Sequence, residues 1–408
     1  MRLKLIIISL MLLCLFTGSC SPARGFDYQL GSIVKPYRFS MVNWEFKTIP
    51  YEAKQWLFGR HEKIDDQTDT VAEYFSLVER IKSLESEIAA INADNGQGDL
   101  ASLEAELNRL QEQRVALAGK VERIIARQIK EALAQQGIFN PMNKYIRLKV
   151  GFPPLDFKLE KPPHLLVISP RDRIESMREI TLKQDLSLEE MESIEARVDK
   201  LGVSSLVVEL GGLGATYPTF VADNASLRFT INTATEEWLH QYLAFKPLGF
   251  LYLLDLTGVS RNYEIAIINE TLVSMASKEI GAMVSEKYYP NYENSAQQKQ
   301  AAESEFDFNR EMREIRRAVD IYLARGEITQ AEEFMEQKRQ YLASMGYQIR
   351  KLNQAYFAFH GTYADRPTSV SPIGVELKKL REQSASLKDF LNTVAAMTSR
   401  QDLSDSIK

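Results

Sequence analysis

A glutamate and a histidine four residues apart, Glu236 and His240, have the spacing with which one face of a helix presents two metal ligands. Glu237 is rotated by one position, where a carboxylate can act as general base on a water molecule at a metal. Glu270 lies further along the chain and can add a third ligand. Zinc accepts carboxylate as well as imidazole ligands, so this set can support metal-assisted hydrolysis, although its oxygens weaken zinc selectivity.

The same segment fits a second interpretation that needs no metal. Thr233-Ala234-Thr235-Glu236 has the pattern of a capping box, in which a glutamate side chain bonds back to the backbone at the start of a helix. Both interpretations stay open at the level of the sequence.

Two helices must position the candidate ligands. Apolar periodicity predicts one from about Thr233 to Phe245, closed by Pro247, and another from about Tyr263 to Lys287. A row of mostly small residues on the second helix would let the two pack closely: Ala266, Glu270, Ser274, Ser277 and Gly281. A glutamate in such a seam is costly unless it is paired or metal-bound, so Glu270 is a site candidate in its own right.

Short aliphatic and β-branched runs predict a small mixed sheet. The four predicted strands are Ile146–Val150, Leu165–Ser169, Ser204–Glu209 and Leu227–Ile231. The segment Gly211-Gly212-Leu213-Gly214 lacks the residues of a phosphate-binding loop and is predicted to be a turn.

Apolar residues repeat at alternating intervals of four and three residues on both sides of the turn Asp94–Asp99. This pattern predicts an antiparallel helical hairpin over residues 71–137, which would serve as a spacer, a partner contact or a dimerisation arm. The whole chain is therefore predicted to be α+β and mainly helical. The expected parts are a signal (1–20), an N-terminal segment packing on the main domain (21–70), the hairpin (71–137), an α+β domain (138–290) and a helical C-terminal subdomain (291–408).

The N-terminus has the order of an export signal, with Arg2 and Lys4 before the apolar run Leu5–Phe16. Cys20 follows small residues and resembles the acylated cysteine of lipoproteins, so lipidation, simple cleavage and an uncleaved anchor all remain open. An exported, membrane-associated protein of the cell envelope is expected. The net charge of −5 is spread without a basic stripe, which argues against a nucleic-acid partner.

Four segments together resemble the gluzincin metallopeptidases, and in particular bacterial aminopeptidase-like proteins of that group. They are Tyr217–Val221 with Leu227–Thr230, the Glu-Glu-x-x-His segment Glu236–His240, Ile268–Thr271, and Leu352–Tyr356 with His360–Tyr363. The resemblance covers roughly residues 200 to 385. It implies a zincin-like domain, in which an edge strand precedes the metal-binding helix and a second helix carries the third ligand.

The resemblance also implies residue roles. His240 becomes the second zinc ligand, Glu270 the third and Glu237 the general base, while Glu236 stands where the first histidine belongs. Tyr363 and His360 become the candidate donors to an oxyanion. Three functions stay open: a zinc peptidase acting on peptides or proteins, a catalytically silent peptide-binding or scaffold protein that meets a partner through its hairpin, and a purely structural envelope protein organised by the hairpin.

Overall fold

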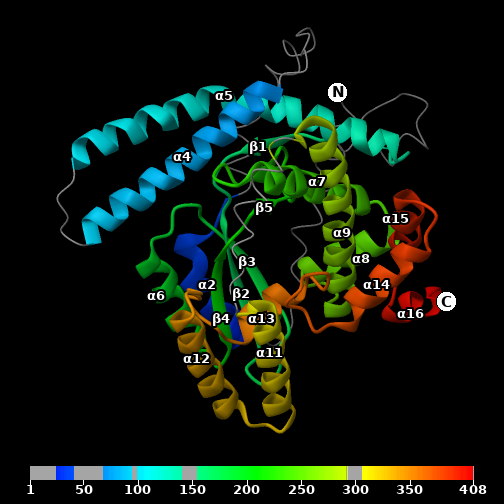
Figure 1. Ribbon diagram of the computed structural model, residues 1–408. Coiled ribbons are helices and arrows are strands. Elements are labelled where there is room, and N and C mark those ends of the chain that lie inside the picture. The colour runs from blue at the N-terminus through cyan, green and yellow to red at the C-terminus, as the bar shows by residue number, and fades with distance from the viewer. Residues whose placement is uncertain are drawn as a thin grey trace.

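The computed structural model describes residues 24–40, 68–93, 99–139, 154–290, 292 and 306–407. The predicted signal, the predicted strand Ile146–Val150 and most of the polar stretch after residue 290 lie outside the described residues. The fold is α+β and mainly helical, as predicted (Figure 1). Within the described part of the chain, no helix is both long and apolar enough to cross a bilayer.

The strands form two sheets of three strands each, where the sequence predicted one. One sheet has the order β3 (Arg178–Leu182), β2 (His164–Ser169) and β4 (Ser204–Glu209), and all of its pairings are antiparallel. β2 and β4 coincide with two of the predicted strands. This sheet packs against α2 (Arg24–Val34) and α6 (Leu188–Asp199), with η1 (Lys35–Tyr37) following α2.

The second sheet has the order β1 (Phe157–Leu159), β6 (Thr219–Val221) and β5 (Gly212–Leu213). β1 runs parallel to β6, and β5 runs antiparallel to it. The strand directly before the ligand helix, β6, is therefore the middle strand of its sheet, and β5 is an edge. The predicted turn Gly211–Gly214 contains this short edge strand.

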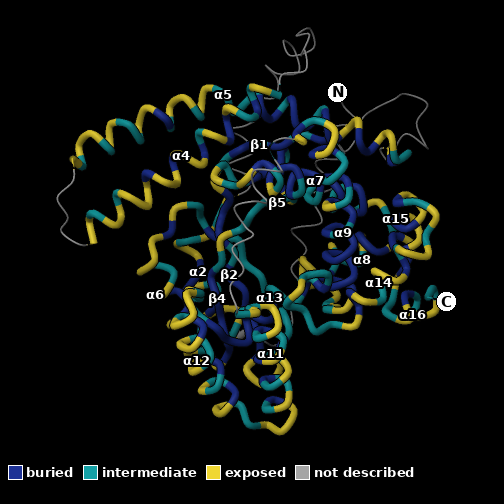
Figure 2. Tube along the Cα trace, viewed as in Figure 1, coloured by how far each residue is buried: buried dark blue, intermediate teal, exposed yellow. Residues whose placement is uncertain are grey.

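The helical hairpin consists of α4 (Thr68–Ala93) and α5 (Leu100–Gln135). Its base joins the main core through buried side chains such as Tyr74, Phe75 and Ile125. Its outer part holds only a small separate cluster centred on Leu84 and Leu110. Figures 1 and 2 show this outer part projecting beyond the rest of the protein, with mostly exposed residues.

The predicted strand Leu227–Ile231 is wrong, because these residues form the first turns of α7 (Leu227–Leu243). Ser226 caps this helix, with its hydroxyl accepting a bond from the amide of Phe229 at 3.3 Å. Leu227, Ile231, Ala234 and Trp238 are buried at helical spacing. A short run that is apolar at alternating positions fits both patterns, and the serine cap favours the helix.

The rest of the main core is helical. α9 (Tyr263–Tyr288) packs against α7, α8 (Pro247–Leu256), α14 (Pro372–Gln383), α15 (Leu387–Ala395) and α16 (Arg400–Ser406). α11 (Phe308–Ala324), α12 (Ile328–Ser344) and α13 (Gln354–Gly361) share a separate apolar cluster, and α13 also packs on β2 and β4.

The small-residue row of α9 brings it close to α7. An added methyl group at Gly281 would lie 1.9 Å from Oδ1 of Asn232 on α7. The hydroxyl of Ser277 donates to the carboxylate of Glu236 at 3.4 Å. The predicted close approach of the two ligand helices is thus present. Glu279, on the same helix, is paired with Arg381 at 2.7 Å.

Pro247 is predicted only to close the preceding helix, but it also begins α8, where proline is favoured in the first turn. The connection between α7 and α8 is tight, because a methyl group at Gly249 would lie 2.0 Å from the backbone oxygen of Leu243. We expect Gly249→Ala to lower the free energy of unfolding by about 1–3 kcal/mol, measured by urea denaturation. Gly31→Ala is the matched control, since a methyl group there meets nothing within 4 Å; an equal loss in both variants would contradict the packing argument.

Candidate metal centre

The candidate site lies where α7 and α9 pack side by side. α7 carries Glu236, Glu237 and His240 well inside the helix, and α9 carries Glu270 in its second turn. The capping interpretation of Glu236 is wrong, because the helix begins ten residues earlier at its cap Ser226. Glu236 instead faces Ser277 across the helix pair.

The three residues expected to bind metal converge. One ligand atom from each of Glu236, His240 and Glu270 lies within 4.8 Å of the others. Nε2 of His240 is 3.6 Å from Oε2 of Glu270. Within the described ranges, this is the only group of three or more histidine, cysteine or acidic side chains with such convergence.

Two neighbours fix the orientation of the candidate ligands. Nδ1 of His240 lies 3.0 Å from Oδ1 of Asn269, so its proton is donated to Asn269 and Nε2 is left facing Glu270. The ring of Tyr252 stacks on that of His240, with 5.4 Å between centroids, and its hydroxyl donates to Oε1 of Glu270. Asn269 belongs to the motif seen in the sequence. Tyr252 is not among the residues predicted from the sequence. Helix α8 was not predicted, and the position of a tyrosine within an apolar run does not mark it as a site residue.

Glu237 lies against the glycine-rich edge strand. Methyl groups added at Gly212 and Gly214 would each lie 2.6 Å from a carboxylate oxygen of Glu237. The amide of Gly214 also donates a hydrogen bond to that carboxylate. The glycines of Gly211–Gly214 therefore allow the backbone to approach Glu237, a role that the sequence pattern alone did not indicate.

Burial and mutual repulsion govern the protonation of the carboxylates. Burial foremost, together with the charge of Glu270, raises the pKa of Glu236 to about 7 against the opposing effect of His240. Burial likewise raises the pKa of Glu237 to about 8. Without a cation, part of this group of carboxylates is therefore protonated at neutral pH.

His240 and Glu270 shift in opposite directions. Burial alone would lower the pKa of His240, but the surrounding carboxylates, Glu270 foremost, raise it to about 9. Burial would raise the pKa of Glu270, yet the charge of His240 and polar contacts with Tyr252 and Tyr363 hold it below its ordinary value. At neutral pH without a metal, the two residues form an imidazolium–carboxylate pair.

The two candidate oxyanion donors occupy different places. Tyr363 follows α13 and lies at the site, where its hydroxyl lowers the pKa of Glu236 and Glu270. His360 instead contacts Arg366, with Nδ1 3.1 Å from its guanidinium. Burial and the charge of Arg366 lower the pKa of His360 to about 4, and none of the site carboxylates contributes to that shift.

The donor set fits a divalent metal ion. Oε2 of Glu270 is buried and makes no direct hydrogen bond, and Nε2 of His240 lies 3.6 Å from it, so both atoms are available to coordinate a cation placed between them. Two carboxylates and one neutral imidazole satisfy zinc with a coordination position left open. Glu236, His240 and Glu270 would hold the ion.

Metal affinity at this site should depend strongly on pH. Binding requires neutral His240 and ionised Glu236, whose pKa values without metal are about 9 and 7. Protons therefore compete more strongly as the pH falls. We expect the zinc dissociation constant to rise about 20-fold from pH 8 to pH 7 and about 50-fold from pH 7 to pH 6. A competition titration with a chromophoric chelator measures this; an affinity that is constant between pH 6 and pH 8 would contradict the protonation scheme.

No family model, curated protein or solved structure matches this chain. The relation to gluzincins accordingly remains a resemblance of short segments, and the site rests on its own geometry.

Proposed function

We propose that this protein is a metal-dependent hydrolase of peptide bonds, with zinc as the metal, acting in the cell envelope. The convergence of Glu236, His240 and Glu270, with Glu237 beside them, is the observation that carries the proposal. The envelope location rests on the N-terminal pattern of charged, apolar and small residues.

The chemistry divides between the metal and the side chains of the site. A bound divalent ion supplies polarisation of a carbonyl group and lowers the pKa of water. Glu237 takes a proton from the attacking water and returns it to the leaving amine. Its pKa is about 8 without a metal, and the positive charge of a bound cation would lower this pKa and favour the ionised form that a general base needs. Tyr363 donates to the oxygen on which negative charge develops. Asn269 holds His240 in the tautomer that leaves Nε2 free.

The short strand β5 supports a peptide as the substrate. It is the edge of its sheet, and Gly212 within it and Gly214 directly after it lie against Glu237. An extended peptide that paired with this edge would bring its backbone carbonyl groups to the general base.

The second candidate is a catalytically silent protein that keeps the site for peptide capture, with the hairpin as a contact for a partner. The ion pair of His240 and Glu270 favours it, because this pair balances part of the site charge without any metal. Glu236 in place of a histidine also makes the ligand set harder and less selective for zinc.

Cleavage of a mixed peptide library by the purified full-length chain separates the two functions. The peptidase predicts cleavage that a chelator abolishes and that added zinc restores. Absence of cleavage with one zinc bound per chain would favour the silent protein.

A further inference from the structure

Tyr363 lies in an irregular segment, so something must hold its hydroxyl at the carboxylates. The residues before and after Tyr363 both form hydrogen bonds with one side chain of α9. The hydroxyl of Thr271 donates to the carbonyl oxygen of Thr362 at 3.2 Å and accepts from the amide of Ala364 at 2.9 Å. Thr271 is fully buried, and the hydroxyl hydrogen and a lone pair are both used.

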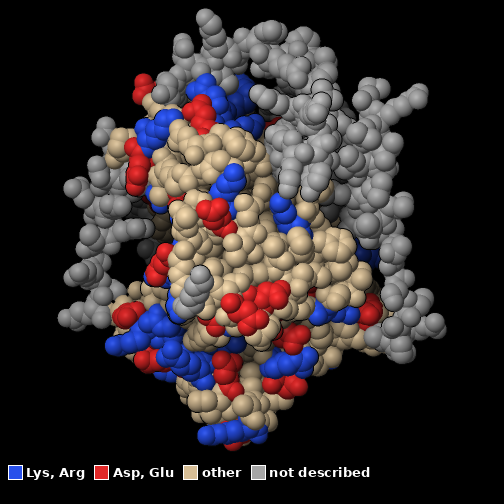
Figure 3. Space-filling view, turned by 90° about the vertical axis from the view of Figure 1, so that its right-hand side faces the viewer, with Lys and Arg blue, Asp and Glu red and all other residues tan. Residues whose placement is uncertain are grey.

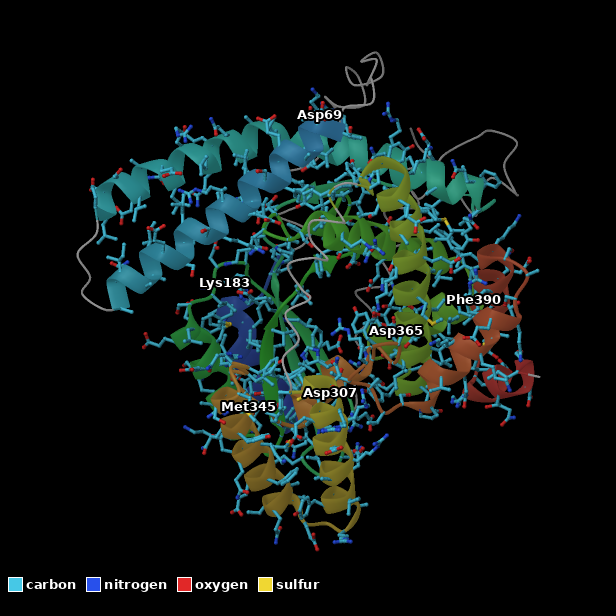
Figure 4. The ribbon with its side chains drawn as sticks, in the orientation of Figure 1. Asp69, Lys183, Asp307, Met345, Asp365 and Phe390 are labelled. Atoms are coloured by element: carbon cyan, nitrogen blue, oxygen red, sulfur yellow. The ribbon has the colours of Figure 1, made fainter. Side chains whose placement is uncertain are left out.

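The next turn of α9 ties down the continuation of the same segment. Oδ2 of Asp365 accepts from the hydroxyl of Ser274 at 3.0 Å and from Nζ of Lys278 at 2.5 Å. Figure 4 shows Asp365 lying against α9. The segment therefore follows α9 over about two turns, and Thr271 is the residue that directly follows the candidate ligand Glu270.

Arg366 covers the other side of Tyr363. Its guanidinium lies 4.2 Å from the centre of the Tyr363 ring, and its amide donates to the carbonyl oxygen of Tyr363 at 3.2 Å. Nδ1 of His360, 3.1 Å away, fixes the guanidinium in place. The ring is thus covered by a cation, while the backbone on both sides of it is fixed by Thr271.

We propose that Thr271 is a positioning residue for Tyr363, with Arg366 as its support. Each residue of Asn269-Glu270-Thr271 then has its own role: Asn269 orients His240, Glu270 is a ligand, and Thr271 holds the oxyanion donor. This inference rests on the proposed peptidase function. Thr271 acts through Tyr363 and touches no reacting atom.

Thr271→Val tests the proposal, because it keeps the shape of the side chain and removes the hydroxyl. We expect kcat of the zinc-loaded protein to fall at least tenfold with KM unchanged, and Thr271→Ser to restore it. In the Tyr363→Phe background, Thr271→Val should cause no further loss. Thr230→Val is the matched control, since Thr230 is also fully buried and its hydroxyl has no partner. Wild-type kcat in Thr271→Val, or losses that multiply in the double variant, would overturn the proposal.

Hydrogen exchange of the metal-free protein gives a readout that does not need activity. The amide of Ala364 should exchange at least tenfold faster in Thr271→Val than in the wild type, and at the wild-type rate in Thr271→Ser and Thr230→Val. Unchanged exchange in Thr271→Val would overturn the positioning role even if the protein cleaves peptides. A wild-type protein that cleaves no peptide would instead refute the proposed function while leaving faster exchange in Thr271→Val as evidence that Thr271 holds the segment.

Discussion

Glu237→Gln is expected to lower kcat for peptide cleavage by about 10²- to 10⁴-fold, the usual contribution of a general base. The amide has the shape of the neutral carboxyl and can still accept from Gly214, so the fold should be unaffected. It cannot take a proton from water. Steady-state kinetics on the zinc-loaded variant measures the effect, with zinc content determined on the same sample.

The control for this variant is Glu279→Gln, which removes a carboxylate from the same helix pair but breaks only the pair with Arg381. It should keep wild-type kcat. Equal rates for Glu237→Gln and the wild type would show that another group activates water.

His240→Ala is expected to weaken zinc binding by more than about 100-fold, since even residues that only orient a ligand contribute 10- to 100-fold. It removes the single imidazole of the set and leaves Glu236, Glu237 and Glu270 to repel one another. The affinity can be measured by competition with a chromophoric chelator at pH 8.

His164→Ala is the matched control, because this histidine is also buried but lies on β2, where Nδ1 is 3.0 Å from the carbonyl oxygen of Lys183. Its zinc affinity should equal that of the wild type. If the two histidine variants lose affinity equally, the ligand assignment of His240 is wrong.

The ligand helices could be predicted because their signals are local. The spacing of Glu236 and His240 defines a helix face, and the row of small residues on α9 indicates a close helix contact that the approach of Gly281 to Asn232 reproduces. The start of α7 was predicted wrongly, since Leu227–Ile231 has apolar residues at both strand and helix spacing, and the interpretation of Glu236 as a cap depended on that error.

Other parts of the site depend on tertiary contacts that no local pattern encodes. Tyr252 donates to Glu270 from α8, and this helix could not be predicted because its sequence is a continuous apolar run without helical periodicity. Gly212 and Gly214 leave room for the Glu237 carboxylate, and they can do so only because the pairing of β5 with β6 places the backbone against Glu237. His360 and Tyr363 are close in sequence, yet the turn after α13 sends only Tyr363 to the carboxylates.

The surface charges of the described residues do not indicate a second functional site on the face shown in Figure 3. On the face shown in Figure 3, basic and acidic side chains lie beside one another around a broad uncharged area. The site differs from this surface because its acidic groups, Glu236, Glu237 and Glu270, are buried close together, an arrangement that is costly unless it serves a chemical function.

The stoichiometry of zinc binding tests the central claim most directly. Metal-free wild-type protein and Glu236→His would each be titrated with zinc at pH 8 and analysed for bound metal after gel filtration. The ligand set predicts one zinc per chain in the wild type, and tighter binding in Glu236→His because a second imidazole suits zinc better than a carboxylate. If neither protein retains zinc, Glu236, His240 and Glu270 do not form a metal site.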